Sequence, residues 1–117
     1  IEAEARARLS EETAARGLLK ELRDKRYDTP ATVTAAGDAL VEEILLERRI
    51  ELWGEGFAAL DLKRLKRGID RNNSNHNAVV VTAAAMKVPA EDKRWIYQIP
   101  QSEIDANKQI NEEHQNP

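Results

Sequence analysis

The sequence predicts an all-α fold in which helical hairpins are followed by a loop-rich, mostly irregular C-terminal segment. Hydrophobic residues make up 41% of the 117 residues, and many of them are alanine or leucine. Only 4% of the residues are aromatic, and 33% are charged. That balance is typical of helices with solvated faces. Apolar residues recur at helical spacing in the first half of the chain, whereas residues 70–77 have the polar, turn-forming composition of a surface loop.

The first predicted hairpin lies at the start of the chain. Residues 1–9 are alanine-rich and helical in pattern, and Ser10 is a plausible N-cap because two glutamates follow it. A second helix is predicted over residues 11–26. Its apolar face has the i, i+3, i+4 spacing and consists of Ala14, Ala15, Leu18, Leu19 and Leu22.

A third helix is predicted after a loop at residues 27–36, in which Pro30 disfavours helical geometry. It covers residues 38–53 and carries apolar side chains on two faces, which is typical of a central helix. One face comprises Leu40, Val41, Ile44, Leu45 and Leu52, and the other comprises Leu46, Ile50 and Trp53.

Glycines delimit the fourth predicted helix. Gly54 and Gly56 interrupt the pattern before it, and Gly68 is placed to end residues 57–67 as a C-cap. Later residues give weaker signals: a short strand at 78–81, an extended segment at 95–100 and a short helix from Ser102. We therefore expect a helical part over residues 1–68 and a loop-rich tail over 69–117, both within a larger domain.

Composition also excludes several classes of function. The formal net charge of -3 argues against a nucleic-acid partner, and the absence of cysteine excludes disulfides and thiolate metal sites. His76 and His114 lack a partner at metal-ligand spacing, so neither a metal nor another cofactor is expected. No apolar run approaches the roughly 18 residues of a membrane span. The chain begins without methionine and shows a helical residue pattern from its first residues, so we expect it to be part of a longer protein.

The segment ERRIELWGEGF contains an arginine in an apolar stripe. A helical projection of residues 38–53 places Arg48 in the middle of the first apolar face, where it requires a carboxylate partner. Glu51, Glu55 and Asp61 are the nearby acids, and the predicted result is an ion-pair network between the third and fourth helices. Carboxylates interleaved with arginines are held ionised, so we predict a structural role and no catalytic residues. The predicted network comprises Glu47, Arg48, Arg49, Glu51, Glu55, Asp61 and Arg64.

This segment resembles the C-terminal signature of the SusD/RagB family, ERR-x-EL-x-x-EG followed by an aspartate, a leucine and a basic residue. Two later elements match in order, IPQSEIDAN at residues 99–107 and the closing QNP at 115–117. Upstream, AEARARL and LLKELRDKRY resemble the family's helical hairpin. Ala58 departs from the pattern, since family members commonly carry an arginine at or near that position.

The resemblance implies a non-catalytic, tetratricopeptide-like outer-membrane lipoprotein of Bacteroidetes-like bacteria that serves polysaccharide utilisation. Such a protein binds oligosaccharides or other nutrients at the cell surface and hands them to a TonB-dependent, SusC-like transporter. Its lipidated N-terminal cysteine would precede the present sequence. A helical scaffold that binds only another protein is the alternative, and an enzyme such as a glycoside hydrolase is a third hypothesis.

The sequence does not identify the ligand, but it offers four candidate contacts. Trp95 and Tyr97 have aromatic faces that suit a sugar ring, although core packing is the competing explanation. Asn73 and Asn75 lie in a polar loop, where their amides have the chemistry to bind sugar hydroxyls.

Overall fold

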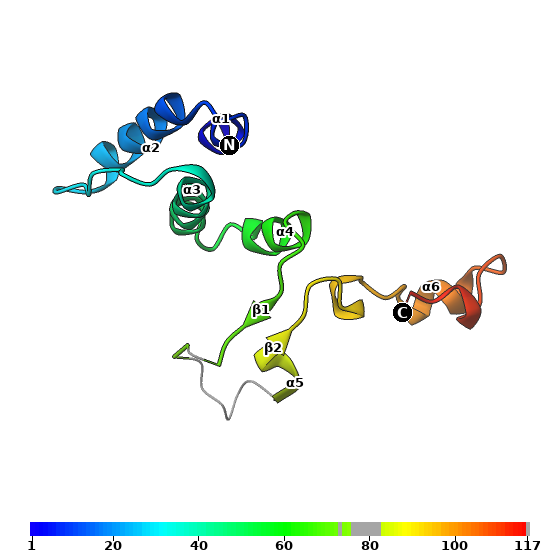
Figure 1. Ribbon diagram of the computed structural model, residues 1–117. Helices are drawn as coiled ribbons and strands as arrows, with labels where there is room; N and C mark the ends of the chain where they lie inside the picture. The colour runs from blue at the N-terminus through cyan, green and yellow to red at the C-terminus, as the bar shows by residue number, and fades with distance from the viewer. Residues whose placement is uncertain (73, 76–82, 117) are drawn as a thin grey trace. The chain divides into compact units, whose positions relative to one another are not determined.

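The computed structural model describes residues 1–72, 74–75 and 83–116, and it divides into two compact units, Ile1–Ala58 and Ala59–Pro117 (Figure 1). Each unit is described by itself. Asn73, His76 and the predicted strand at 78–81 lie outside the described residues. The division into residues 1–68 and 69–117 of a larger domain stays a prediction.

The first unit contains the predicted hairpin, formed by α1 (Glu2–Arg8) and α2 (Glu12–Arg26), which contact each other and α3 (Gly37–Glu51) (Figure 1). Apolar side chains at helical spacing face inward because their burial removes apolar surface from water. The buried apolar residues of this unit are Ala7, Ala15, Leu19, Leu40, Val41, Ile44 and Leu45.

The prediction that Ser10 caps α2 is wrong. Ser10 adopts a left-handed backbone with φ of 64°, and the N-cap position falls to Glu11, which makes no side-chain cap bond. The chain reverses direction within a few residues here, and the backbone N–H of Glu11 donates to the Arg6 carbonyl at 2.9 Å. The reversal requires the left-handed residue at Ser10, which moves the helix start one residue further along the chain.

Only one of the two apolar faces of α3 is buried. Leu40, Val41, Ile44 and Leu45 form the core, as above, while Leu46 and Ile50 are exposed and Trp53, just beyond the helix, is 86% exposed. The expectation of burial on both sides is therefore wrong for the part of the chain that the structure describes.

Helix α4 (Phe57–Arg64) ends earlier than predicted, and Gly68 is not its C-cap. Lys66 takes the left-handed position with φ of 50°, its N–H donates to the Lys63 carbonyl, and the Arg67 N–H donates to the Leu62 carbonyl at 2.8 Å. These two bonds are those of a Schellman motif, which satisfies the last carbonyls of the helix.

In the second unit Gly68 allows two backbone segments to approach closely. A Cβ at this position would lie 2.9 Å from the Ala90 backbone nitrogen and against the Val88 carbonyl. This approach leads into an antiparallel ladder of β1 (Ile69–Asp70) with β2 (Lys87–Val88), which pairs the first residue of β1 with the last of β2. This pairing was not predicted from the sequence.

Short elements complete the second unit. They are α5 (Ala83–Met86), a 3-10 turn at Lys93–Trp95, α6 (Gln101–Ala106) and a 3-10 turn at Glu112–His114. The all-α prediction is confirmed, because a two-stranded sheet is the only sheet that the described residues form.

Candidate functional site

A buried ion pair joins α2 to α3. The Arg23 Nε lies 2.7 Å from a carboxylate oxygen of Glu47, and its Nη1 lies 2.6 Å from one of Glu43. The side chains of Arg23 and Glu47 are only 8% and 9% exposed, and the Tyr27 hydroxyl donates to the second Glu47 oxygen at 3.0 Å. A buried charge is tolerated when it is paired and hydrogen-bonded in this way.

Hydrogen bonds within this cluster raise the pKa values of Arg23 and Tyr27. Burial opposes the charge on Arg23, but the hydrogen bonds to Glu47 and Glu43 outweigh burial and raise the pKa of the guanidinium. The hydrogen bond from Tyr27 to Glu47, with burial second, raises the pKa of the phenol. The Arg23 guanidinium therefore stays charged at neutral pH, which suits a structural role.

A second ion pair between α2 and α3 lies closer to solvent. The Arg26 guanidinium makes two parallel bonds to Glu51, Nε to Oε2 at 2.8 Å and Nη2 to Oε1 at 2.6 Å. The hydrogen bond from Arg26 lowers the pKa of Glu51. Two acids of the ERRIELWGEGF segment, Glu47 and Glu51, thus point to α2.

The remaining signature residues lie around the break between α3 and α4. Arg48 is half-buried, and its guanidinium carbon lies 5.6 Å from the centroid of the Phe57 ring. Arg49 and Glu55 are exposed. In the second unit Arg64 pairs with Asp61 at 2.7 Å. A clamp from Arg48 or Arg49 to Asp61 would join the two units, and it stays a prediction.

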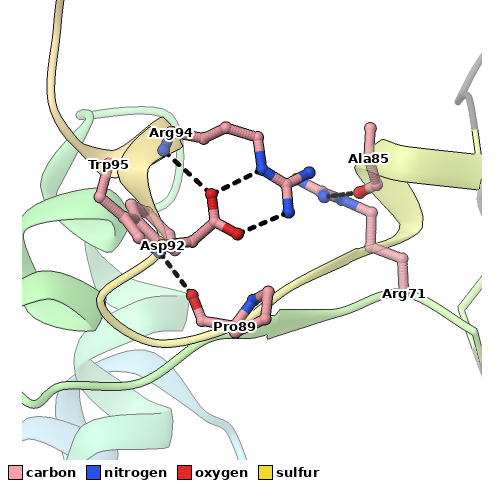
Figure 2. Close-up of polar contacts among 6 residues, drawn as sticks. All are labelled: Arg71, Ala85, Pro89, Asp92, Arg94 and Trp95. Atoms are coloured by element: carbon pink, nitrogen blue, oxygen red, sulfur yellow. Dashed lines mark hydrogen bonds and ion pairs between the residues drawn. The ribbon is translucent and has the colours of Figure 1, made fainter. Parts of the chain in front are cut away.

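Of the four candidate ligand contacts, Trp95 is fixed most firmly (Figure 2). It is half-buried, and its indole N–H donates to the Pro89 carbonyl at 2.8 Å. Tyr97 is 93% exposed and Asn75 is exposed, so neither side chain is packed in the core. Asn73 lies outside the described residues.

Asp92 shapes the turn that presents Trp95 (Figure 2). Its carboxylate accepts from the Arg94 backbone N–H at 3.0 Å and from the guanidinium Nε and Nη2 at 2.7 and 2.9 Å. The side-chain hydrogen bond from Arg94, followed by the backbone bond, holds the pKa of Asp92 well below its usual range. Neither Asp92 nor Arg94 was predicted from the sequence to be a site residue.

A groove of about 280 Å³ lies between α4 and the segment that contains this turn. Its apolar lining comes from Leu62, Trp95 and Ile96. Its charged lining comes from Lys63, Lys66, Arg67, Glu91 and Asp92. The groove therefore combines an aromatic and aliphatic surface with five charged groups, which is a lining able to contact a polar ligand.

Comparison with known families identifies the chain. The model of the SusD family matches residues 1–117, which is the whole sequence. The chain belongs to the SusD family. No curated protein and no solved structure matches it. SusD-family proteins are generally non-catalytic, and the membership suggests nutrient or glycan binding at the cell surface.

Two SusD elements at the C-terminal end bind each other. The Gln115 side chain accepts from the Ile99 backbone N–H at 2.7 Å and donates to the Ile99 carbonyl at 2.9 Å. The Asn116 amide donates to the Tyr97 carbonyl at 2.8 Å. Gln115 and Asn116 thus hold the backbone at and just before the start of the IPQSEIDAN element.

Among residues 1–72, 74–75 and 83–116, no group of three or more histidine, aspartate or glutamate side chains is placed to hold a metal ion. His114 instead lies 2.7 Å from the Asn111 side-chain oxygen. None of the helices in these ranges has the length and apolarity that a membrane crossing requires.

Proposed function

We propose that this protein binds glycans or other nutrients without chemical change at the outer-membrane surface and delivers them to a TonB-dependent, SusC-like transporter. The observation that carries the proposal is the match of the SusD family model over all 117 residues. The proposal includes a lipid anchor on a cysteine upstream of this sequence and a host related to the Bacteroidetes.

The geometry of the charged signature supports a non-catalytic role. General acid-base chemistry requires carboxyl groups with pKa values moved apart toward the working pH. Here the hydrogen bond from Arg26 lowers the pKa of Glu51, away from neutral pH, and Glu47 accepts hydrogen bonds from both Arg23 and Tyr27. These side chains also lie between helices, where they contribute to packing.

Calorimetry on the intact protein tests the proposal. A panel of neutral and acidic oligosaccharides should give saturable heat for at least one glycan, with no shorter products released on long incubation. The intact protein should also co-purify with a SusC-like transporter from outer membranes. No heat from the panel would contradict glycan binding, and steady product release would favour a glycoside hydrolase.

The exposed face of α3 favours one alternative, a helical scaffold that binds another protein. Leu46, Ile50 and Trp53 follow helical spacing and are exposed, and such apolar patches often mark interaction sites. Under this alternative an Ile50→Glu variant would lose transporter capture, and no glycan would give heat. Under the main proposal the Ile50→Glu variant should still give heat of binding with the glycan.

A further inference from the structure

The groove between α4 and the Trp95 turn has features of a site for one class of sugar. We propose that it binds a single uronic-acid unit of a glycan, with the sugar ring on Trp95 and the carboxylate at Lys63. The inference rests on the proposed function and deepens it, because it names the chemical class of the ligand and a place for it.

Trp95 provides a fixed aromatic surface in the groove. The indole N–H of Trp95 is bonded to the Pro89 carbonyl at 2.8 Å, so the ring is held in one orientation before any ligand arrives. The backbone N–H of Trp95 also donates to the Asp92 carbonyl at 2.9 Å. A preorganised aromatic face binds the apolar face of a sugar ring with little loss of side-chain entropy.

The lining of the groove carries an excess of positive charge. Three cations and two carboxylates leave one net positive charge. Glu91 is paired with Lys66 at 3.0 Å, and Asp92 is paired with Arg94. Both acids are thus partly neutralised, and the excess positive charge fits a ligand that carries one negative charge per sugar unit.

Lys63 is the cation best placed to meet that charge. Its ammonium donates to the Trp95 carbonyl at 3.4 Å, which is long for a hydrogen bond. Within the residues that the structure describes, no carboxylate forms a salt bridge with Lys63. The ammonium lies beside the aromatic residue and is able to turn toward a carboxylate on a sugar stacked there.

The size of the groove limits the ligand. At about 280 Å³ it lies near the lower end of the roughly 300–1,000 Å³ typical of ligand pockets. It therefore suits one sugar unit of a longer chain. A carboxylate with a single charge also matches the lining better than a unit that carries several sulfates.

The test is calorimetry on the intact protein with three probes. They are trigalacturonate, its fully methyl-esterified form, which has the same rings without the charge, and a heparin-derived sulfated disaccharide. Trigalacturonate should bind at least about tenfold more tightly than its ester, since a hydrogen bond to a charged group has roughly that effect. The sulfated disaccharide should bind more weakly than trigalacturonate.

Variants assign the effect to the groove. Lys63→Gln should weaken trigalacturonate binding about tenfold and remove the preference for acid over ester. Trp95→Ala should weaken both forms, because both stack on the ring. Lys108→Gln is the matched control, since Lys108 is exposed and does not line the groove.

The outcomes separate this inference from the proposed function. Equal affinity for acid and ester, an unchanged preference in Lys63→Gln, or binding of only the sulfated probe would overturn the inference. In each of those cases, tight binding of a neutral glycan at another site on the protein would still support the proposed function. If neither these probes nor the wider panel gave heat, glycan binding itself would be refuted.

Discussion

Ion pairs serve different purposes in the two units of this chain. In the first unit Arg23 and Glu47 lie 24 residues apart in sequence, and their buried contact joins two helices. In the second unit Asp92 and Arg94 lie two residues apart, and their exposed contact shapes a single turn. The same chemical groups therefore stabilise tertiary structure in one case and local structure in the other, and the cost of removing them should differ accordingly.

The largest effect is expected from Arg23→Ala. Removing the guanidinium leaves the buried Glu47 carboxylate without its main partner, so the free energy of unfolding should fall by about 3–5 kcal/mol. Urea unfolding of the intact protein, with hydrogen exchange of the α2 and α3 amides, measures the loss. Arg26→Ala is the control on the same helix and should cost much less, because its pair with Glu51 is more exposed. A loss below about 1 kcal/mol for Arg23→Ala would show that the pair is not buried in solution.

A double replacement sharpens the same test. Arg23→Met with Glu47→Leu removes both charges and keeps side-chain volume, so its stability should lie within about 2 kcal/mol of the parent protein. Glu43, which is only half-buried, can then turn to water. If the double variant is as unstable as Arg23→Ala alone, the loss comes from packing, and the buried charge is not the cause.

Two glycines give the next comparison. Gly68→Ala should destabilise the second unit by roughly 1–3 kcal/mol, because its Cβ would press on the backbone of Val88 and Ala90. Gly17→Ala in α2 meets nothing within 4 Å and should stabilise the first unit by roughly 0.5–1 kcal/mol. Thermal unfolding of both variants checks the two signs, and a neutral Gly68→Ala would mean that the β1 and β2 segments do not approach closely.

The sequence predicted the helices of the first unit well, because each has a clear apolar periodicity. It missed the buried role of Arg23, although this residue follows Ala15 and Leu19 at four-residue steps on the buried face of α2. A basic residue in the last turn of a helix is already explained by the helix dipole. Only the fold shows that an acid 24 residues away lies opposite it.

The second unit was harder to predict for physical reasons. Strands of two residues, such as Ile69–Asp70, are too short to show a period. The sequence predicted that the helix ends at Gly68, but Lys66 takes the left-handed position and Gly68 lies where two backbone segments approach closely. Trp95 could be singled out by its residue type. Lys63 became a candidate only because the fold places it beside Trp95, which is 32 residues away in sequence.

A smaller effect is expected at the half-buried Arg48. Phe57→Leu keeps an apolar side chain but removes the ring beneath the guanidinium, so the first unit should lose about 0.5–1 kcal/mol. Phe57→Tyr keeps the ring face and is the matched control. Urea unfolding measures both, and an equal loss in the two variants would assign the effect to packing around Phe57.

The smallest effect on stability is expected at Asp92, where pH is the most direct probe. Because the pKa of Asp92 is depressed in the folded state, its contribution is present above the ordinary aspartate pKa of about 3.9 and is lost as pH falls through the folded value. Carboxyl NMR should therefore show Asp92 still ionised in acid that protonates an ordinary aspartate.

Two variants test the origin of this effect. Arg94→Gln should raise the pH midpoint of the Asp92 titration, since it removes the side-chain hydrogen bonds and keeps the backbone N–H. Asp92→Asn should leave global unfolding nearly unchanged, because its amide oxygen can still accept that N–H at the start of the turn. An ordinary midpoint for Asp92 would place its carboxylate in water, away from Arg94, and Trp95 would then lack the turn that holds it over the groove.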